Sequence, residues 1–91
     1  MKEYIKHDVD KNIFFIQGEV ENKGQVTYTI NNGVMNINGT FVDPDYRSHG
    51  YAKELVDAAV LYAKSKDLKL HPTCSYAVKV VERDYADLLA N

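Results

Sequence analysis

The residue types that hold a phosphate group occur together in one segment, Arg47-Ser48-His49-Gly50-Tyr51-Ala52. This segment follows a predicted strand and opens a long predicted helix from about Ser48 to Ser65. The first turn of a helix exposes unpaired N–H groups and carries about half a positive charge, so an anion there accepts several backbone hydrogen bonds. Gly50 has no Cβ and would let phosphates approach the backbone, while Arg47 adds a fixed positive charge. The pattern predicts a phosphate site; the alternative is a helix start with an ordinary glycine.

The chain's one cysteine, Cys74, is the second candidate for chemistry. It lies just before a helix predicted over Tyr76–Leu89, and a position before a helix lowers the pKa of a thiol, which favours reactivity. The alternative is a small, buried apolar residue. A single cysteine cannot form an intramolecular disulfide, which fits a reducing cytosol.

Four extended segments are expected before the phosphate segment. They are a weak strand at Tyr4 and Ile5, Ile13–Gln17, the alternating run Val26–Ile30 and Val34–Val42, with a polar turn over Gly18–Gly24. Asn31-Asn32-Gly33 predicts a tight hairpin, because Asn and Gly tolerate positive φ. In the last strand, alternation places Met35, Ile37 and Phe41 on one face. Gly39 interrupts that face and marks a bulge or a close backbone approach.

Two helices and a fifth strand complete the expected fold. The first helix has an apolar stripe made of Ala52, Leu55, Val56, Ala59 and Ala63. A short strand over Leu68–His71 follows, and the last helix would turn Val78, Val81, Tyr85 and Leu89 inward after a cap at Thr73 or Ser75. The strand–helix–strand unit from Val34 to His71 should bring its strands parallel through a right-handed crossover. We predict an α+β, or mixed α/β, domain with helices packed on a sheet.

Size, charge and composition restrict the function classes. The chain has 91 residues, enough for one domain over 1–91, and its net charge of −2 comes without the basic cluster that nucleic-acid binding requires. No apolar run reaches the roughly 20 residues of a membrane helix, and the charged N-terminus is unlike a signal peptide. We expect a cytoplasmic protein that binds neither nucleic acid nor membrane. His7, His49 and His71 form no metal-ligand pattern, so no metal site is predicted.

Four segments together resemble the GCN5-related N-acetyltransferase (GNAT) superfamily. The pattern R-x-x-G-x-A at Arg47–Ala52 resembles its pyrophosphate loop, and Phe41–Arg47 resembles the strand end before that loop. Pro72–Tyr76 and Tyr85–Leu88 resemble a small single-domain subfamily whose members carry a Cys after the second parallel strand. The resemblance covers nearly the whole chain. It implies a minimal GNAT-like fold that binds acetyl-CoA as a cosubstrate and transfers acetyl directly to a primary amine.

The resemblance also implies roles for individual residues. Cys74 would protonate the departing CoA thiolate or accept the acetyl group, and Tyr76 is the alternative acid. The pantetheine arm would lie between two splayed parallel strands. Cofactor contacts would come from Phe41, Val42, Arg47, Ser48, His49, Gly50, Tyr51, Ala52, Ser75 and Lys79. The ordinary alternatives are a core aromatic for Tyr76, a helix cap for Ser75 and a solvated surface cation for Lys79.

One position departs from the small family. Its members usually carry a His just before the Thr that corresponds to Thr40, and here that position is Gly39. If that His assists acceptor deprotonation, its loss favours the alternative function, a non-catalytic acyl-CoA-binding module or sensor; His71 is a further candidate base. A scaffold that has lost the ligand is a third possibility. The resemblance predicts an open acceptor site that suits a protein or peptide amine, or a weakly selective enzyme that also takes small-molecule amines. An open sheet edge on so small a domain allows a monomer or weak dimer.

Overall fold

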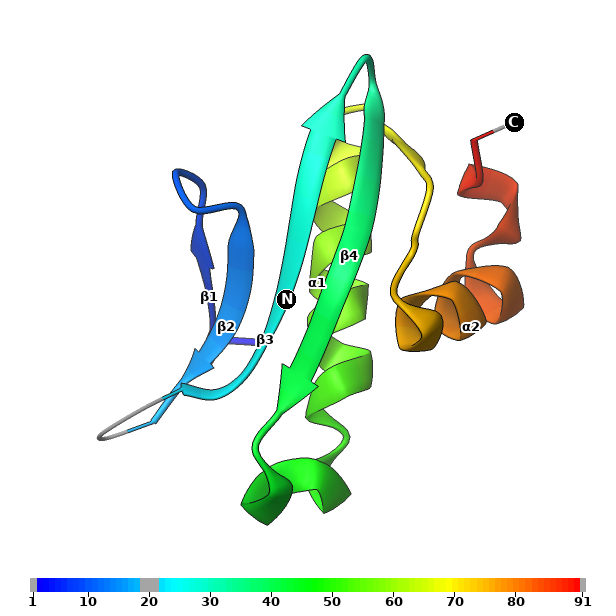
Figure 1. The fold of residues 1–91 in the computed structure, drawn as a ribbon. Helices are drawn as coiled ribbons and strands as arrows, with labels where there is room; N and C mark the ends of the chain where they lie inside the picture. Colours follow the sequence, from blue (N-terminus) through cyan, green and yellow to red (C-terminus); the bar gives the residue numbers. More distant parts are fainter. Residues whose placement is uncertain (1, 19–21, 91) are drawn as a thin grey trace.

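A five-stranded sheet forms the body of the protein (Figure 1). The computed structural model describes residues 2–18 and 22–90. In order across the sheet, the strands are β1 (Ile5–Asp8), β2 (Ile13–Gln17), β3 (Asn22–Asn31), β4 (Val34–Val42) and β5 (Lys69–Leu70). β1 to β4 pair antiparallel, and β5 pairs parallel to β4. The mixed α/β architecture predicted from the sequence is confirmed.

The strand bounds differ from the predictions mainly at the turns. The hairpin between β3 and β4 is confirmed, with Asn32 at φ 52° and Gly33 at φ 79°. β3 begins at Asn22, inside the turn predicted over Gly18–Gly24, and residues 19–21 of that turn lie outside the described part of the chain. The fifth strand is shorter than predicted, with Lys69 and Leu70 paired to Val34 and Met35 of β4.

Both predicted helices have different ends. The helical elements are η1 (Pro44–His49), α1 (Tyr51–Ser65), α2 (Ser75–Asp84) and η2 (Ala86–Leu88). The first helix does not start at Ser48, because Asp43 and Pro44 open a separate 3₁₀ turn and Asp43 Oδ1 accepts the Asp45 N–H at 2.9 Å. The second ends at Asp84, since Tyr85 leaves helical geometry at φ −137°. Its N-cap is Cys74, neither Thr73 nor Ser75.

A bulge in β4 reverses which residues face the helices. Thr27 pairs with Gly39 and Tyr28 pairs with Ile37, so Asn38 is an extra residue in β4. Before it, Met35 and Ile37 are buried beneath α1, as predicted. After it the alternation shifts by one residue. Phe41, predicted on the same face as Met35, is instead 51% exposed, and Val42 is buried in its place.

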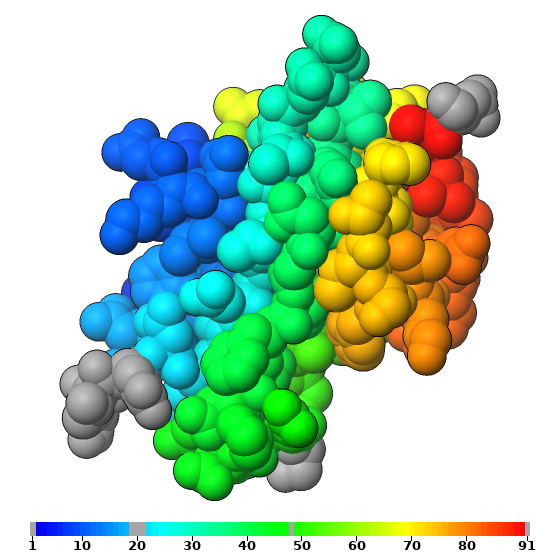
Figure 2. All heavy atoms as spheres, in the orientation of Figure 1, coloured from blue at the N-terminus to red at the C-terminus, as the bar shows by residue number. Residues whose placement is uncertain are grey.

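The core lies between one face of the sheet and the two helices. α1 buries Leu55, Val56, Ala58, Ala59, Val60 and Ala63 against the sheet, while Ala52 from the predicted stripe is half-buried. α2 buries Ala77, Val80 and Val81, so Val81 confirms its predicted position and Val78 is half-buried. Figure 2 shows the opposite face of the sheet, where no helix covers β3 and β4. Ile30 lies near the hairpin and is exposed, although its alternation with Val26 and Tyr28 predicted burial.

An aromatic cluster joins β1, β2, β3 and α1, and it predicts a pH-dependent stability. The His7 ring stacks on Phe14 at 3.9 Å, lies 4.5 Å from the Tyr62 ring, and its Nε2 is 2.6 Å from the Tyr28 hydroxyl. Burial lowers the pKa of His7, and Asp8 opposes this more weakly. Below the ordinary His pKa of 6.5 the unfolded chain therefore binds more protons than the folded chain.

We expect the free energy of unfolding to be greatest above pH 6.5 and to decrease as the pH falls through that value toward the lowered pKa of His7. His7→Phe keeps an aromatic ring but cannot titrate, so its stability should change less between pH 7 and pH 5. Urea unfolding across this range would measure both slopes. Equal slopes for the two proteins would contradict a half-buried His7 that is neutral in the folded state.

Candidate functional site

The start of α1 presents free backbone N–H groups next to Gly50. Gly50 has φ 74° and ψ 16°, a left-handed conformation that ends η1 and begins α1. The first carbonyl used inside the helix is that of Gly50, which accepts the Glu54 N–H at 3.2 Å. The N–H groups of Tyr51, Ala52 and Lys53 precede that bond and have no partner within the helix. They therefore face outward at the positive end of a fifteen-residue helix.

Gly50 is suited to this site by its backbone conformation and by the space around it. A residue with a side chain rarely adopts this φ. A Cβ added to Gly50 would meet no atom within 4 Å. The space on this side of the loop is therefore open to an anion that approaches the backbone.

A cavity of about 270 Å³ lies beside this helix start. It is lined by Thr40, Phe41, Val42, Arg47, Ala52 and Tyr76. These residues come from the end of β4, from η1, from the first turn of α1 and from the first turn of α2. The cavity therefore brings together Phe41, Val42, Arg47, Ala52 and Tyr76, all predicted from the sequence, and adds Thr40.

The cavity exists because β4 and the chain after β5 separate. The N–H groups of Thr73 and Cys74 both donate to the Ile37 carbonyl, at 3.1 and 3.2 Å. Beyond Ile37, β4 continues to Val42 while the other chain turns into α2. The outer edge of β4 is thus left without a neighbouring strand in the part of the chain that the structure describes, and the separation follows directly after the bulge at Asn38.

Arg47 lies at the mouth of the cavity with its side chain exposed. Its Nε donates to the Val42 carbonyl at 3.3 Å. This bond holds the guanidinium between the end of β4 and the start of α1. A cation in this position favours an anionic group near the free N–H groups of α1.

Cys74 is half-buried at the start of α2, and its Sγ lies 3.3 Å from the Thr40 hydroxyl. Burial acts to raise the pKa of the Cys74 thiol. The nearby Thr40 hydroxyl, and then the backbone amides of Ala77, Tyr76 and Thr40, favour the thiolate; together they outweigh burial and lower the pKa of Cys74. A larger fraction of Cys74 is therefore in the thiolate form at neutral pH than in an ordinary cysteine.

Thr40 was missed in the sequence, because its position depends on the bulge. Without the bulge, strict alternation from Ile37 through Asn38 and Gly39 would turn Thr40 to the open face of the sheet. The bulge turns it toward α2, where it lines the cavity and reaches Cys74. A Cβ on Gly39 would come within 2.7 Å of Thr27 Oγ1, so a larger residue there requires Thr27 to move.

The remaining predicted residues lie around the cavity without lining it. Ser75 and Lys79 are exposed on α2, and His71 is exposed just after β5. The ring of His49 lies 5.2 Å from that of Tyr51, which is half-buried against the core. Ser48 belongs to η1 by its backbone, and its side chain lies outside the described part.

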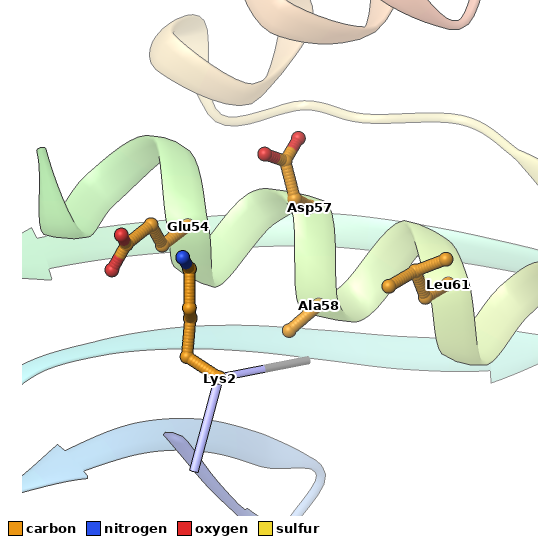
Figure 3. Close-up of a pocket in the computed structure, with 5 residues that line it drawn as sticks. All are labelled: Lys2, Glu54, Asp57, Ala58 and Leu61. Carbon is orange, nitrogen blue, oxygen red and sulfur yellow. The ribbon is translucent and has the colours of Figure 1, made fainter. Parts of the chain in front are cut away.

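A second hollow, of about 380 Å³, lies on the outer side of α1 (Figure 3). It is lined by Lys2, Glu54, Asp57, Ala58 and Leu61. Its two carboxylates are already bonded, Glu54 to the Tyr4 hydroxyl and Asp57 to Lys53 and Tyr85. It contains none of the predicted site residues, so the smaller cavity at the end of β4 is the candidate site.

Two further observations concern the described residues as a set. None of the helices within residues 2–18 and 22–90 has the length and apolar character needed to cross a membrane. In the same ranges, no three or more His, Cys, Asp or Glu side chains are grouped so that they could hold a metal ion.

Comparison with known proteins identifies a family that matches this chain. A family model described as GCN5-related N-acetyl-transferase matches residues 13–88. The chain is also similar to the solution structure of a GCN5-like candidate N-acetyltransferase from Staphylococcus aureus, at 29% identity and a TM-score of 0.77, covering 100% of this chain and 92% of that one. No curated protein matches the chain.

More distant solved structures share the fold. The ribosomal-protein-S18-alanine N-acetyltransferase from Escherichia coli is 14% identical with a TM-score of 0.64, over 91% of this chain and 53% of that one. The aminoglycoside N-acetyltransferase AAC(6')-Iy, in complex with CoA, is 19% identical with a TM-score of 0.58, over 99% of this chain and 70% of that one.

Proposed function

Because the chain belongs to the GCN5-related N-acetyltransferase family, we propose that it transfers an acetyl group from acetyl-CoA to a primary amine. One observation carries the proposal. The cavity at the free edge of β4 leads to the unpaired N–H groups at the start of α1. A thioester with a narrow arm and a diphosphate needs this combination, an apolar channel that ends at an anion site.

The chain's residues fit such a cosubstrate. The amides of Tyr51, Ala52 and Lys53, together with Arg47, would hold the diphosphate. A cavity of about 270 Å³ is too small for a whole CoA molecule and suits its narrow pantetheine arm. When bound, acetyl-CoA supplies an activated acyl group, and the protein supplies its position.

The free edge of β4 would align the arm. The Asp43 N–H donates to the Lys23 carbonyl, and a Cβ on Gly24 would meet the Phe41 carbonyl, so the backbone of Phe41 faces β3. Backbone groups alternate along a strand, so those of Thr40 and Val42 face the cavity. We therefore expect Phe41 to contribute its side chain, and the Thr40 and Val42 backbone to provide the polar contacts.

The chemistry then requires one bond formed and one broken. The amine nitrogen forms a C–N bond to the acetyl carbonyl carbon, the C–S bond of the thioester breaks, the amine loses a proton and the departing thiolate gains one. Cys74 or Tyr76 would donate the proton to the thiolate, because both lie at the start of α2 beside Thr40 or in the cavity wall. In the variant route Cys74 first accepts the acetyl group and then passes it to the amine.

The function is tested with wild-type protein, CoA and acetyl-CoA. CoA should raise the melting temperature, since a ligand of the folded state adds about 2.7 kcal/mol of stability at 100 times its Kd. Acetyl-CoA with a mixture of peptides should yield free CoA and acetylated amines, detected by mass spectrometry. A temperature shift without acetyl transfer would support the non-catalytic acyl-CoA-binding module, and no shift at millimolar CoA would support a scaffold that has lost its ligand.

The acceptor is expected to be a protein or peptide amine. No helix covers β3 and β4 on the face of the sheet opposite α1 (Figure 2), so an acceptor that reaches the cavity from that side meets an open surface. The same mass spectrometry would identify the acetylated peptides and any acetyl group on Cys74.

A further inference from the structure

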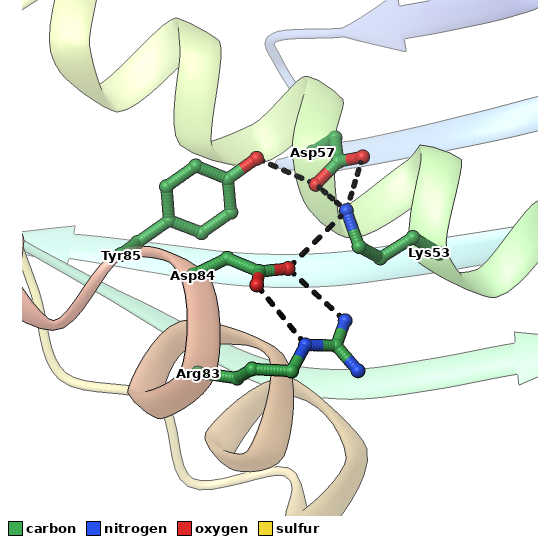
Figure 4. A network of polar contacts seen from close by, with 5 residues as sticks. All are labelled: Lys53, Asp57, Arg83, Asp84 and Tyr85. Atoms are coloured by element: carbon green, nitrogen blue, oxygen red, sulfur yellow. Dashed lines mark hydrogen bonds and ion pairs between the residues drawn. The ribbon is translucent and has the colours of Figure 1, made fainter.

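A network of charged and phenolic groups joins α1 to the end of α2 (Figure 4). Lys53 Nζ lies 2.8 Å from both carboxylate oxygens of Asp57 and 3.5 Å from Asp84 Oδ2. The Tyr85 hydroxyl donates to Asp57 Oδ1 at 2.6 Å. Arg83 donates to Asp84 at 3.0 Å. Two residues of α1, Lys53 and Asp57, thus contact Asp84 and Tyr85 at the end of α2, while Arg83 pairs with Asp84 on the same helix.

Few side chains of α2 itself are buried, so polar contacts contribute to how this helix lies against α1. This helix has ten residues and buries Ala77, Val80 and Val81, three small side chains on one face. Its start is fixed, because the Cys74 N–H donates to the Ile37 carbonyl at 3.2 Å. Its far end is joined to α1 by the bond from Tyr85 to Asp57 and by the ion pair from Lys53 to Asp84.

The two helices that the network joins also form walls of the cavity. Lys53 follows Ala52, which forms the α1 wall of the cavity, and α2 carries Tyr76, which forms the opposite wall. Cys74, just before α2, lies with its Sγ 3.3 Å from the Thr40 hydroxyl of β4. A change in the tilt of α2 about its fixed start would therefore alter the width of the cavity and the hydrogen bonds to Cys74.

We propose that Tyr85, through its hydroxyl bond to Asp57, is a positioning residue that sets the tilt of α2 and with it the separation of the two helical walls around Cys74. Tyr85 touches none of the reacting groups. The binding of acetyl-CoA in this cavity rests on the proposed function, whereas the effect of Tyr85 on the geometry around Cys74 is independent of it.

The groups keep the required protonation states over a wide pH range. Burial, and then the hydrogen bond to Asp57, raise the pKa of Tyr85 to about 12, so its hydroxyl remains a donor. The hydrogen bond to Asp57 is also the main cause of the raised pKa of Lys53. The bond to Arg83 lowers the pKa of Asp84. The network should therefore persist throughout the pH range of the test below.

The test is Tyr85→Phe, which removes the hydroxyl and keeps the ring. The rate at which iodoacetamide alkylates Cys74, followed from pH 6 to pH 10, reports the pKa of the chain's one thiol without any ligand. We expect the midpoint of this profile to move to higher pH in Tyr85→Phe. The Kd for CoA should rise by a factor of about 3 to 10, the range that one lost hydrogen bond supports. Asp57→Asn retains an oxygen that can accept from Tyr85 and should move the midpoint less than Asp57→Ala.

Tyr28→Phe is the matched control, because it removes a phenolic hydrogen bond, to His7, from the aromatic cluster away from α2. It should lower the melting temperature while leaving the Cys74 profile in place. If Tyr85→Phe also lowers only the melting temperature, the positioning role is wrong. If wild-type protein binds no CoA but the profile still shifts in Tyr85→Phe, the proposed function fails and the positioning of α2 stands.

Discussion

Gly50→Val is expected to abolish the rise in melting temperature that CoA causes in the wild-type protein. The substitution has two effects, one on the backbone and one on the space around it. Valine at φ 74° is strained by roughly 1–2 kcal/mol or more, because an L-residue in this conformation brings its Cβ close to its own carbonyl. Its side chain would also occupy the open space through which a diphosphate would approach the amides of α1. In a thermal-shift titration, the melting temperature without ligand would measure the backbone strain. Its change with added CoA would measure the loss of binding.

Gly33→Val provides the matched control for this experiment. Gly33 has φ 79° and, like Gly50, no atom within 4 Å of an added Cβ. It lies in the β3–β4 hairpin, at the end of the sheet opposite η1 (Figure 1). Both variants should lose a similar melting temperature, roughly 4–16 °C for a domain of this size, and Gly33→Val should keep its full response to CoA. Equal responses in both variants would place the diphosphate elsewhere.

Cys74→Ala is expected to reduce acetyl transfer by a factor of about 10² to 10⁴ while leaving the Kd for CoA nearly unchanged. This is the range for loss of a proton donor or acceptor at the reacting atoms. Cys74 is half-buried, so the cost in stability should be small. Steady-state kinetics at saturating acetyl-CoA would separate kcat from binding.

Two further variants resolve the role of the thiol. Tyr76→Phe removes the other proton donor at this site and should leave most of the activity if Cys74 is the acid. Thr40→Val removes a hydrogen bond that lowers the pKa of Cys74, so alkylation of the thiol should require higher pH. Acetylated Cys74 in the intact protein would favour the covalent route. Full activity in Cys74→Ala would instead make it a structural residue.

The sequence predicted those parts of the site that depend on local chemistry. The turn at Asn31-Asn32-Gly33, the burial of Met35 and the segment from Arg47 to Ala52 between strand and helix follow from residue types and short spacings. Such features need no knowledge of distant residues, since turn geometry and alternation are encoded within a few positions.

The parts that depend on register were wrong or were missed. The exposure of Phe41 and the contact between Thr40 and Cys74 both arise from one extra residue opposite Thr27, which no local pattern locates. The hydroxyl bond from Tyr85 to Asp57 joins residues 28 positions apart and requires α2 to end at Asp84 rather than Leu89. Gly39 signalled a bulge, but not its consequence for the residues that follow.

The strand β4 therefore presents two opposite alternations within nine residues. Its first half places odd-numbered side chains beneath α1, and its second half places even-numbered ones there. The position of the bulge in this strand is consequently as important as the strand's composition. If β4 instead paired regularly through Asn38, Val42 would turn outward and Thr40 would turn away from the sulfur, although every side chain that lines the cavity would still be present in the chain.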